Sequence, residues 1–363
     1  MNVSITRVRP LIRLALAVAL AAGVVIPVQA EITWTNYTTG NGLGSNHVEG
    51  IYADGGTIYA ATRGGVSVST NNGMSWTNYT TADGLGGNNV LSVYAAGGTI
   101  YAAGEGGVSV STNNGVSWSN YPTWTGLGSS NVFGVYASGS AIYAATVGGL
   151  SVSTSNGASW TNYTTGNGLG DNWNLGVYAV GSTIYAATVG GLGISTNNGA
   201  SWTNYTTASG LGSNEVSGVY AVGSTIYAAT WGGLSVSTNN GTSWTNYTTA
   251  DGLLSNHLYG VYAAGGTIYA ATLGGLSVSN NNGTSWTNYT MGDGLGSNWV
   301  LDVYAAGGTI YAATGDWPGS VGGLSIGASA VPEIDPAGFG SVAALVTGAL
   351  GLIERRRLKA KAA

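Results

Sequence analysis

The chain has 363 residues, of which only 6% are charged, and it contains 63 Gly, 22 Tyr, 12 Trp, two His and no Cys, with a formal net charge of −5. An ordinary soluble domain has about 25% charged residues, so the deficit is large, but 44% hydrophobic residues exclude charge-driven disorder and can fill a core. The absence of Cys excludes disulfide bonds, thiol catalysis and thiolate metal sites.

The first 30 residues have the layout of an export signal. A polar stretch with three Arg precedes an apolar run over 14–26, and the segment ends on Val28-Gln29-Ala30. We predict a secretory signal peptide over 1–30 that signal peptidase removes after Ala30. The alternative is a retained membrane anchor, but 13 apolar residues are too few to span a hydrocarbon core of about 30 Å.

A repeat of fixed length follows. Trp occurs every 42 residues, at positions 34, 76, 118, 160, 202, 244 and 286, and three columns of Tyr beginning at Tyr37, Tyr52 and Tyr59 keep the same period. Such a period is typical of propellers and solenoids. Each unit contains four short runs rich in Val, Ile, Thr, Tyr and Trp, separated by Gly and Asn turn signals. Four strands per unit predict the blade of a β-propeller.

The number of units predicts a closed ring. Residues 31–330 form seven units of 42 residues once a six-residue insertion at 315–320 is set aside. The first Trp run, 32–37, has no preceding runs of its own, and the last unit lacks a Trp run. We therefore predict an all-β domain over 31–330, a seven-bladed β-propeller of four-stranded blades. In it, strand 32–37 completes the seventh blade and covers an edge that would otherwise be open to pairing.

A second motif recurs in the turn before the Trp run. Six units carry Ser-x-Asn-x-Gly-x-Ser-Trp or a near variant, and the third copy has Ser155 in place of Asn. The motif resembles the Asp-box (BNR) repeat of sialidase-type propellers, and the phrase over 42–46, Gly-Leu-Gly-Ser-Asn, resembles the regulator-type propeller repeat. Both resemblances imply a propeller fold. Because Asn can bond its own turn and Gly supplies a positive φ, we interpret the box as a folding device and not as a catalytic site.

One face of the predicted ring differs between units. In a propeller, the connections that lead to each innermost strand share a face with the turns between the second and third strands. The position before the innermost strand reads His47, Asn89, Asn131, Trp173, Glu215, His257 and Trp299. The matching turn position reads Arg63, Glu105, Val147, Val189, Trp231, Leu273 and Val321.

Five Trp lie outside the repeat, and all five fall in these variable connections. Together with neighbouring His, Arg and Tyr they are the candidate binding residues: Trp124, Trp173, Trp231, Trp299, Trp317, His47, His257, Arg63 and Tyr259. Flat apolar faces can stack on sugar rings or on partner side chains at low entropy cost. The alternative is neutral variation of loop residues with local packing.

The candidate residues argue against an enzyme. Sialidases hold the substrate carboxylate with several Arg, whereas Arg63 is the only basic residue between 31 and 330. Glu49 and Asp302 lie on the innermost runs of blades that become neighbours on closure, so a glycoside hydrolase is a less favoured alternative. For His47 and His257 a metal pair is the less favoured reading, and solvated loop residues are the default. We predict no catalytic residue, no cofactor and no metal.

The end of the chain, 331–363, has the layout of a sorting segment. It contains the motif Pro332-Glu333-Ile334-Asp335-Pro336, an apolar stretch over 337–353, and a basic tail over 354–361 with Arg355, Arg356 and Arg357. Seventeen apolar residues at 1.5 Å each give about 25 Å, which predicts one short transmembrane helix.

This segment resembles the PEP-CTERM sorting signal of Gram-negative bacteria that make exopolysaccharide, with Ile334 at the third motif position. The resemblance implies processing by an exosortase-type membrane enzyme. The alternative is a plain C-terminal anchor.

Charge and address narrow the predicted function. Between 31 and 330 stand eleven acids against one Arg, so polyanions, nucleic acids among them, are excluded as partners. We predict an exported protein of the cell envelope, outer surface or extracellular medium, transiently anchored in the inner membrane by its C-terminal helix. Its predicted role is a non-catalytic binding module for carbohydrate such as exopolysaccharide, or for an envelope protein. The near-identity of the units favours the alternative, a structural spacer in the surface matrix.

Overall fold

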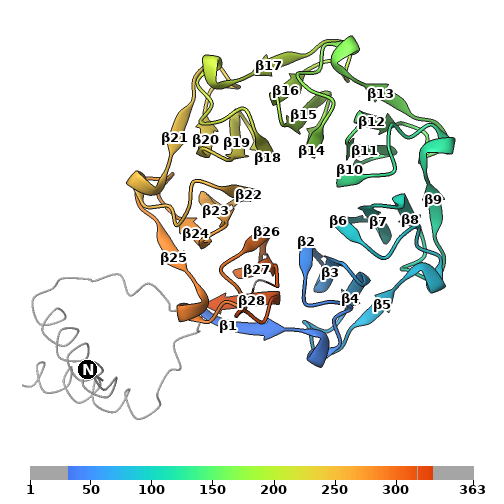
Figure 1. Cartoon of the computed structure of the whole chain (residues 1–363), viewed down its shortest axis with the longest axis vertical. Helices are drawn as coiled ribbons and strands as arrows, with labels where there is room; N and C mark the ends of the chain where they lie inside the picture. Colours follow the sequence, from blue (N-terminus) through green and yellow to red (C-terminus); the bar gives the residue numbers. More distant parts are fainter. Residues whose placement is uncertain (1–31, 317, 330–363) are drawn as a thin grey trace, which may run out of the picture. The chain divides into compact units, whose positions relative to one another are not determined.

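The computed structural model describes residues 32–316 and 318–329. These residues form seven four-stranded sheets arranged as the blades of a ring (Figure 1). The predicted all-β, seven-bladed propeller with four-stranded blades is therefore confirmed. The predicted signal peptide, the sorting segment and Trp317 lie outside the described residues. Among the helices that the structure does describe, none is long and apolar enough to cross a membrane.

Each blade has its first strand next to the ring axis and its fourth strand at the outer rim (Figure 1). Blades 1 to 3 consist of β2 (Val48–Asp54), β3 (Thr57–Thr62), β4 (Gly65–Ser69) and β5 (Thr77–Tyr79); β6 (Val90–Ala96), β7 (Thr99–Gly104), β8 (Gly107–Ser111) and β9 (Ser119–Tyr121); and β10 (Val132–Ser138), β11 (Ala141–Thr146), β12 (Gly149–Ser153) and β13 (Thr161–Tyr163). Blades 4 and 5 consist of β14 (Asn174–Val180), β15 (Thr183–Thr188), β16 (Gly191–Ser195) and β17 (Thr203–Tyr205); and β18 (Val216–Val222), β19 (Thr225–Thr230), β20 (Gly233–Ser237) and β21 (Thr245–Tyr247). Blades 6 and 7 consist of β22 (Leu258–Ala264), β23 (Thr267–Thr272), β24 (Gly275–Ser279) and β25 (Thr287–Tyr289); and β26 (Val300–Ala306), β27 (Thr309–Thr314), β28 (Gly323–Ser329) and β1 (Ile32–Tyr37).

Seven short 3-10 helices begin the connections between blades. They are η2 (Thr39–Asn41), η3 (Thr81–Asp83), η4 (Thr123–Thr125), η5 (Thr165–Asn167), η6 (Thr207–Ser209), η7 (Thr249–Asp251) and η8 (Met291–Asp293). In η3, Asp83 accepts hydrogen bonds from the backbone N–H and the hydroxyl of Thr80, at 2.9 and 3.0 Å. This capping arrangement fixes the start of the connection and gives a structural role to the acid at this position.

The hydrophobic core lies between adjacent blades. One cluster joins Tyr59, Ala61 and Val66 of blade 1 to Leu85 and Val90 beside and within blade 2, and equivalent clusters recur around the ring. The Ala pair in the middle of β3 is fully buried. Small residues in the second strand allow neighbouring sheets to approach near the axis, while Trp and Tyr fill the wider space near the rim.

The N-terminal strand closes the ring, as the sequence predicts. β1 pairs with β28 of blade 7. Asn36 of β1 donates to the carbonyl of Gly294 at 2.9 Å and accepts from the Ser325 hydroxyl at 2.6 Å. The ring of Trp34 packs edge-on against Tyr289 of blade 6, with centroids 5.5 Å apart. These contacts reproduce those between blades inside the repeat, so the seam between blades 6 and 7 is built like the others.

The Ser-x-Asn-x-Gly turn is held by its own side chains. In blade 1, the Ser69 hydroxyl accepts from the N–H of Gly73 at 2.8 Å, and the side-chain oxygen of Asn71 accepts from the N–H of Ser75 at 2.9 Å. Asn72 has a φ of +57°, a strained value that a short polar side chain tolerates. In the third copy, the Ser155 hydroxyl accepts from the N–H of Ser159 at 3.0 Å, so Ser replaces Asn without loss of that bond.

A ring of seven tyrosines surrounds the axis. Successive centroids are 4.7 to 5.0 Å apart, and the series returns to its start: Tyr52, Tyr94, Tyr136, Tyr178, Tyr220, Tyr262 and Tyr304. Burial raises the pKa of Tyr178 and of Tyr220 to about 12. These two phenols therefore stay neutral at physiological pH. The sequence predicts the column, but the continuous belt exists only because the ring closes.

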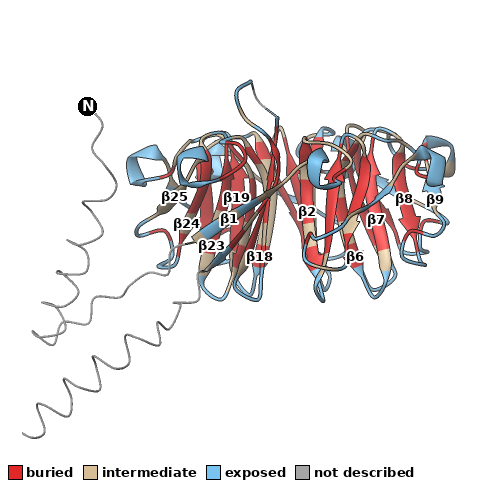
Figure 2. Cartoon of the chain, turned by 90° about the horizontal axis from the view of Figure 1, so that it is seen from below, coloured by how far each residue is buried: buried red, intermediate tan, exposed pale blue. Residues whose placement is uncertain are grey.

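The ring has two different faces. We call the side with the 3-10 helices and the turns between second and third strands the loop face, and the side with the Gly-Gly and Asn-Gly turns the turn face (Figure 2). Because Tyr37 at the end of β1 leads into η2, strand β1 begins at the turn face. β28 starts from a loop-face turn and therefore ends at the turn face as well.

Candidate functional site

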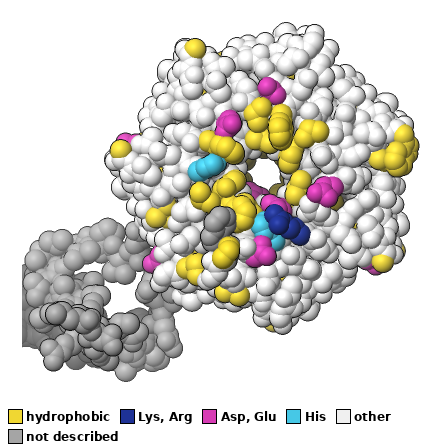
Figure 3. Space-filling model, in the orientation of Figure 1, with side chains coloured by type: hydrophobic (Ala, Val, Ile, Leu, Met, Phe, Trp, Pro, Cys, Tyr) yellow, Lys and Arg dark blue, Asp and Glu magenta, His cyan; other side chains and the backbone are white. Residues whose placement is uncertain are grey.

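Aromatic side chains from four consecutive blades line up on the loop face. Trp231 of blade 5 packs on His257 of blade 6 with centroids 4.1 Å apart, and His257 stacks on Tyr259 at 5.5 Å with an interplanar angle of 13°. Tyr259 contacts Trp299 of blade 7 at 6.2 Å, and Trp299 meets the edge of His47 of blade 1 at 5.3 Å. We call these five residues the aromatic arc. Figure 3 shows hydrophobic side chains gathered around the central opening, with His and Arg beside them.

One end of the arc is fixed by charged groups. His47 is only 2% exposed, its Nε2 lies 3.1 Å from Oε1 of Glu49, and its Nδ1 contacts a carboxylate oxygen of Asp316 in the blade 7 insertion. Arg63 Nε lies 3.2 Å from the same oxygen of Glu49. The default expectation that His47 is a solvated loop residue is therefore wrong, because the insertion and Glu49 enclose it.

The pKa values of this cluster follow from burial and pairing. Burial alone would lower the pKa of His47, but the carboxylates of Glu49 and Asp316 outweigh it and raise that pKa. Burial would raise the pKa of Glu49, but His47 and Arg63 lower it overall. The hydrogen bond to His47 lowers the pKa of Asp316. The two carboxylates thus stabilise the imidazolium form of His47, and the imidazolium in turn stabilises both carboxylates in their charged form.

The structure corrects the predicted alignment of blade 7 at two points. These are the residue in the turn between the second and third strands, and the start of the insertion that follows it. In six blades the turn residue donates its N–H to the carbonyl before the innermost strand, as Arg63 does to His47 at 3.3 Å. In blade 7, Gly315 makes this bond to Trp299 at 2.9 Å, so Gly315 and not Val321 belongs to the column. A Cβ on Gly315 would lie 2.6 Å from the indole of Trp299. The missing side chain is what lets Trp299 fold over this turn.

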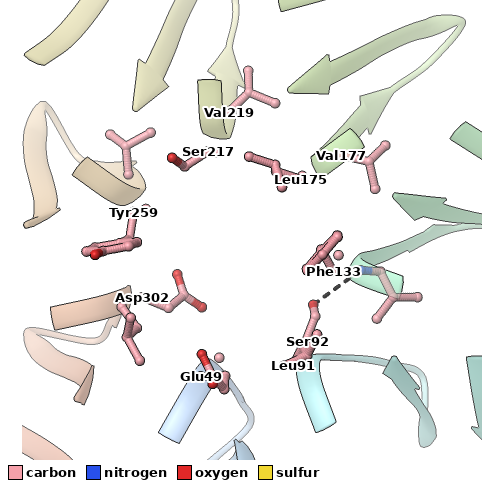
Figure 4. Close-up of a pocket in the computed structure, with 18 residues that line it drawn as sticks. Glu49, Leu91, Ser92, Phe133, Leu175, Val177, Ser217, Val219, Tyr259 and Asp302 are labelled. Atoms are coloured by element: carbon pink, nitrogen blue, oxygen red, sulfur yellow. Dashed lines mark hydrogen bonds between the residues drawn. The ribbon is translucent and has the colours of Figure 1, made fainter. Parts of the chain in front are cut away.

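A collar of side chains surrounds the channel mouth beside the arc. Each innermost strand has a β-bulge that inserts one extra residue, such as Glu49 between Val48 and Gly50. A bulge can re-aim a side chain out of the regular pattern. Here it turns one residue per blade toward the channel, and these residues form the collar: Glu49, Leu91, Phe133, Leu175, Ser217, Tyr259 and Leu301 (Figure 4). With Trp231 they line a hollow of about 360 Å³.

Below the collar, the channel narrows to a pocket of about 200 Å³. The collar residues form its upper wall, and at the next position of each innermost strand five blades place Gly, blade 2 places Ser92 and blade 7 places Asp302, which points into the pocket (Figure 4). The Asp302 carboxylate accepts from the N–H of Ile51 at 3.0 Å and from that of Val303 at 2.8 Å. Burial raises the pKa of Asp302 to about 6, and the two backbone bonds only partly offset this.

The structure brings most of the predicted residues together. His47, Arg63, Trp231, His257, Tyr259 and Trp299 form or adjoin the arc. Trp124 and Trp173 do not join it, although both are exposed on the same face, at 86% and 51%. Tyr259 and Trp299 separate the two His, and the described residues contain no group of three or more His, Asp or Glu suited to a metal. The sequence did not predict the pairing of His47 with Glu49 and Asp316.

Comparisons with known proteins show the fold. No protein-family model and no curated protein sequence matches the chain. Among solved structures, it is similar to the extracellular domain assigned to a hybrid two-component system of B. thetaiotaomicron, with a TM-score of 0.70 and 20% identity over 84% of this chain and 42% of that one. It is also similar to YCF48 bound to D1 peptide (TM-score 0.60, 14% identity, 83% of this chain and 97% of that one).

A third similar structure is a GH74 enzyme of Niastella koreensis (TM-score 0.56, 23% identity, 78% of this chain and 43% of that one). The chain thus spans about two fifths of the first and third of these proteins. Identities between 14% and 23% show a shared propeller fold and nothing more. The Asp-box and PEP-CTERM resemblances stay predictions.

Proposed function

We propose that this protein is an exported, non-catalytic binding module whose loop face holds a carbohydrate against the aromatic arc. The arc is the observation that supports the proposal. Other blades place Asn or Val at the positions of His47, His257 or Trp231, so the blade itself does not require aromatic residues there. The rings that contact one another all come from the four consecutive blades 5, 6, 7 and 1, whereas Trp124 and Trp173 do not join them.

The chemistry of the arc suits sugar rings. Trp231 is 45% exposed, and its indole N–H donates to the Ser217 hydroxyl at 3.1 Å, so one face of the ring is held in a fixed orientation. It borders the hollow at the collar, which combines apolar walls with a few polar groups such as Ser217 and Glu49. A preformed hollow with few oriented polar groups is the usual form of a small-ligand site, and preorganised aromatic rings lose little entropy on binding.

The acidic surface of the domain indicates which charge the ligand can carry. Arg63 is the one basic residue between 31 and 330, and it is already paired with Glu49. A polyanionic polysaccharide would meet repulsion from the acidic surface with no free cation to offset it. The proposed ligand is therefore a neutral or cationic carbohydrate.

Export and display are part of the proposal. The signal over 1–30, the motif over 332–336 and the similarity to extracellular propellers support passage through signal peptidase and an exosortase-type enzyme. The protein is then released or held at the outer surface after transient anchoring in the inner membrane.

A binding experiment with a matched control tests the proposal. Full-length protein, solubilised from membranes, is titrated with bacterial polysaccharides while Trp fluorescence is followed. Trp231→Ala should weaken binding about 30-fold or more, because hot-spot aromatics contribute about 2 kcal/mol or more. Trp124→Ala, which removes an equally large but distant exposed ring, should change nothing. Equal effects of the two variants, or no binding to any polysaccharide, would count against the arc.

The near-identity of the units supports a second candidate, a structural spacer of the surface matrix. If the protein is a spacer, the surface matrix should assemble normally in a strain that carries Trp231→Ala. Assembly should be lost only when the whole propeller is deleted. A glycoside hydrolase is less favoured, since Glu49 is already paired with His47 and Arg63 and is not free to act as an acid. Release of reducing ends from any bound polysaccharide would reverse that judgement.

A further inference from the structure

We propose that the pocket below the collar receives the ammonium group of an amino sugar, so that the bound carbohydrate is one with free amines. The proposal rests on the proposed function and names the sugar class. It draws on the cavity, the aromatic wall around it, and the one carboxylate that points into it.

The wall below the collar is built to leave space. At the position of Asp302, five other blades have Gly and one has Ser92. A Cβ on Gly50 would lie 3.1 Å from the carbonyl oxygen of Leu91 in the next blade, so a side chain at this position requires the neighbouring strand to shift by a few tenths of an ångström. Blade 7 alone places a charged side chain here, and this side chain faces the cavity of about 200 Å³.

The Asp302 carboxylate has no cation beside it. Its protein partners are the N–H groups of Ile51 and Val303. The one Lys or Arg within residues 32–316 and 318–329 is Arg63, and Glu49 engages it at the rim. Buried charges in proteins are normally paired with an opposite charge. A ligand ammonium group would supply the missing cation. The net negative charge of a domain with eleven acids and one Arg would also attract it.

Bridging between blades does not by itself explain the charge. Ser92 of blade 2 makes the corresponding bridge with a hydroxyl, which accepts from the N–H of Val135 at 3.2 Å (Figure 4). Asp302 makes the same kind of bridge to Ile51. A neutral side chain is therefore enough to form the hydrogen bond between neighbouring blades. The negative charge of Asp302 is not needed for that bond, and we assign it to ligand binding.

The surrounding aromatic rings favour an organic cation over a metal ion. Tyr259 and Phe133 line the same pocket, and aromatic faces attract ammonium groups. The described residues offer no group of three or more ionisable metal ligands. An amino sugar fits better than a lysine side chain, because its ring would lie at the collar beside Trp231 while its amine reaches Asp302.

The test compares two ligands that share a sugar backbone and differ at its nitrogen, which is an amine in one and a neutral acetamide in the other. Glucosamine oligosaccharides and their N-acetylated counterparts of equal length are titrated against the full-length protein at neutral pH. The expected result is at least tenfold tighter binding of the free-amine form. In Asp302→Ser, which copies the solution of blade 2, that preference should fall to about one, while Trp124→Ala should keep it. A lysine-rich peptide that competes more strongly than the amino sugar would overturn the sugar assignment.

A pH series gives a second readout that does not depend on the variant folding well. Amines stay protonated on acidification, whereas Asp302 becomes neutral below its pKa of about 6. The preference for the amine should therefore decline as pH falls through 6, while binding of the acetylated form stays level. If both oligosaccharides bind equally at every pH, this inference fails and the carbohydrate proposal stands. If neither binds and Trp231→Ala has no effect on any polysaccharide, the proposed function fails first.

Discussion

Replacing Asp316 by Asn should loosen the blade 7 insertion in a way that depends on pH. Asp316 contacts His47, which is buried between Glu49, Trp299 and the insertion, with Arg63 on the far side of Glu49. Asn keeps the size of the side chain but removes its charge. The seam between blades 7 and 1 then loses one of the two carboxylates that stabilise the imidazolium.

The magnitude follows from the exposure of the pair. A hydrogen bond to a charged group contributes about 1.5 to 3 kcal/mol when protected from water, but Asp316 is 55% exposed, so solvent screening reduces the expected loss to about 1 kcal/mol. A domain of this size has an unfolding entropy of about 0.6 kcal/mol/K, which converts the loss into a Tm decrease of about 2 °C.

The sign of the pH dependence is fixed by the two partners. The folded pKa of His47 is raised above 6.5, so its contribution is full below that value and declines as pH rises through the raised pKa. The folded pKa of Asp316 is lowered below 3.8, so its contribution is lost only as pH falls through that range. The Tm difference between wild type and Asp316→Asn should therefore be largest near pH 5 to 6 and should shrink as pH rises through the raised pKa of His47.

Differential scanning calorimetry of the full-length protein across this range is the assay. Asp171→Asn is the matched control, because Asp171 also accepts from a loop-face backbone N–H, that of Trp173 at 2.7 Å, without a His partner. Its Tm difference should not vary between pH 5 and 8. A difference for Asp316→Asn that stays constant with pH, or grows toward alkaline pH, would refute the reasoning about His47.

Three further predictions concern the fold and the address. In calorimetry, Trp34→Ala should lower the Tm more than Trp160→Ala and should broaden the unfolding transition. The reason is that noncovalent contacts alone hold β1 in blade 7. Gly73→Ala should cost clearly more stability in urea unfolding than Gly55→Ala: both have positive φ, but only at Gly73 would a Cβ lie 2.6 Å from the Tyr37 ring, so equal losses would contradict the packing argument. Replacing the three Arg of the tail 354–361 by Ala should leave an unprocessed precursor in the membrane fraction, detected by intact mass; normal processing would argue against an exosortase-type signal.

Much of the fold was predictable because the sequence is a tandem repeat. The Trp column and each Tyr column recur every 42 residues. A strand pattern that is too weak to identify a blade in one unit therefore identifies it when seven units repeat it. The role of β1 followed from the missing Trp run in the last unit. The tyrosine belt did not follow, because the contact of Tyr52 with Tyr304 depends on ring closure and not on local sequence.

The candidate site was predictable only in part, for a related reason. Comparison of the units shows which positions depart from the blade pattern, and this identified Trp231, His257 and Trp299 as residues of one face. It could not show that His47 meets Asp316, which lies 269 residues away in an insertion with no counterpart in other blades. It also aligned Val321 where Gly315 belongs, since only the hydrogen bond to Trp299 reveals the register of a unique loop.

The location of the bound ligand is the most direct test of the central claim that the aromatic arc binds carbohydrate. Oxidative footprinting with mass spectrometry measures how fast individual Trp and Tyr side chains are modified with and without a polysaccharide that the full-length protein retains. The account predicts that bound polysaccharide protects Trp231 and Tyr259 and leaves Trp124, the most exposed of the indoles that the structure describes on the loop face, at its free rate. Protection of Trp124 with no change at Trp231 would contradict it.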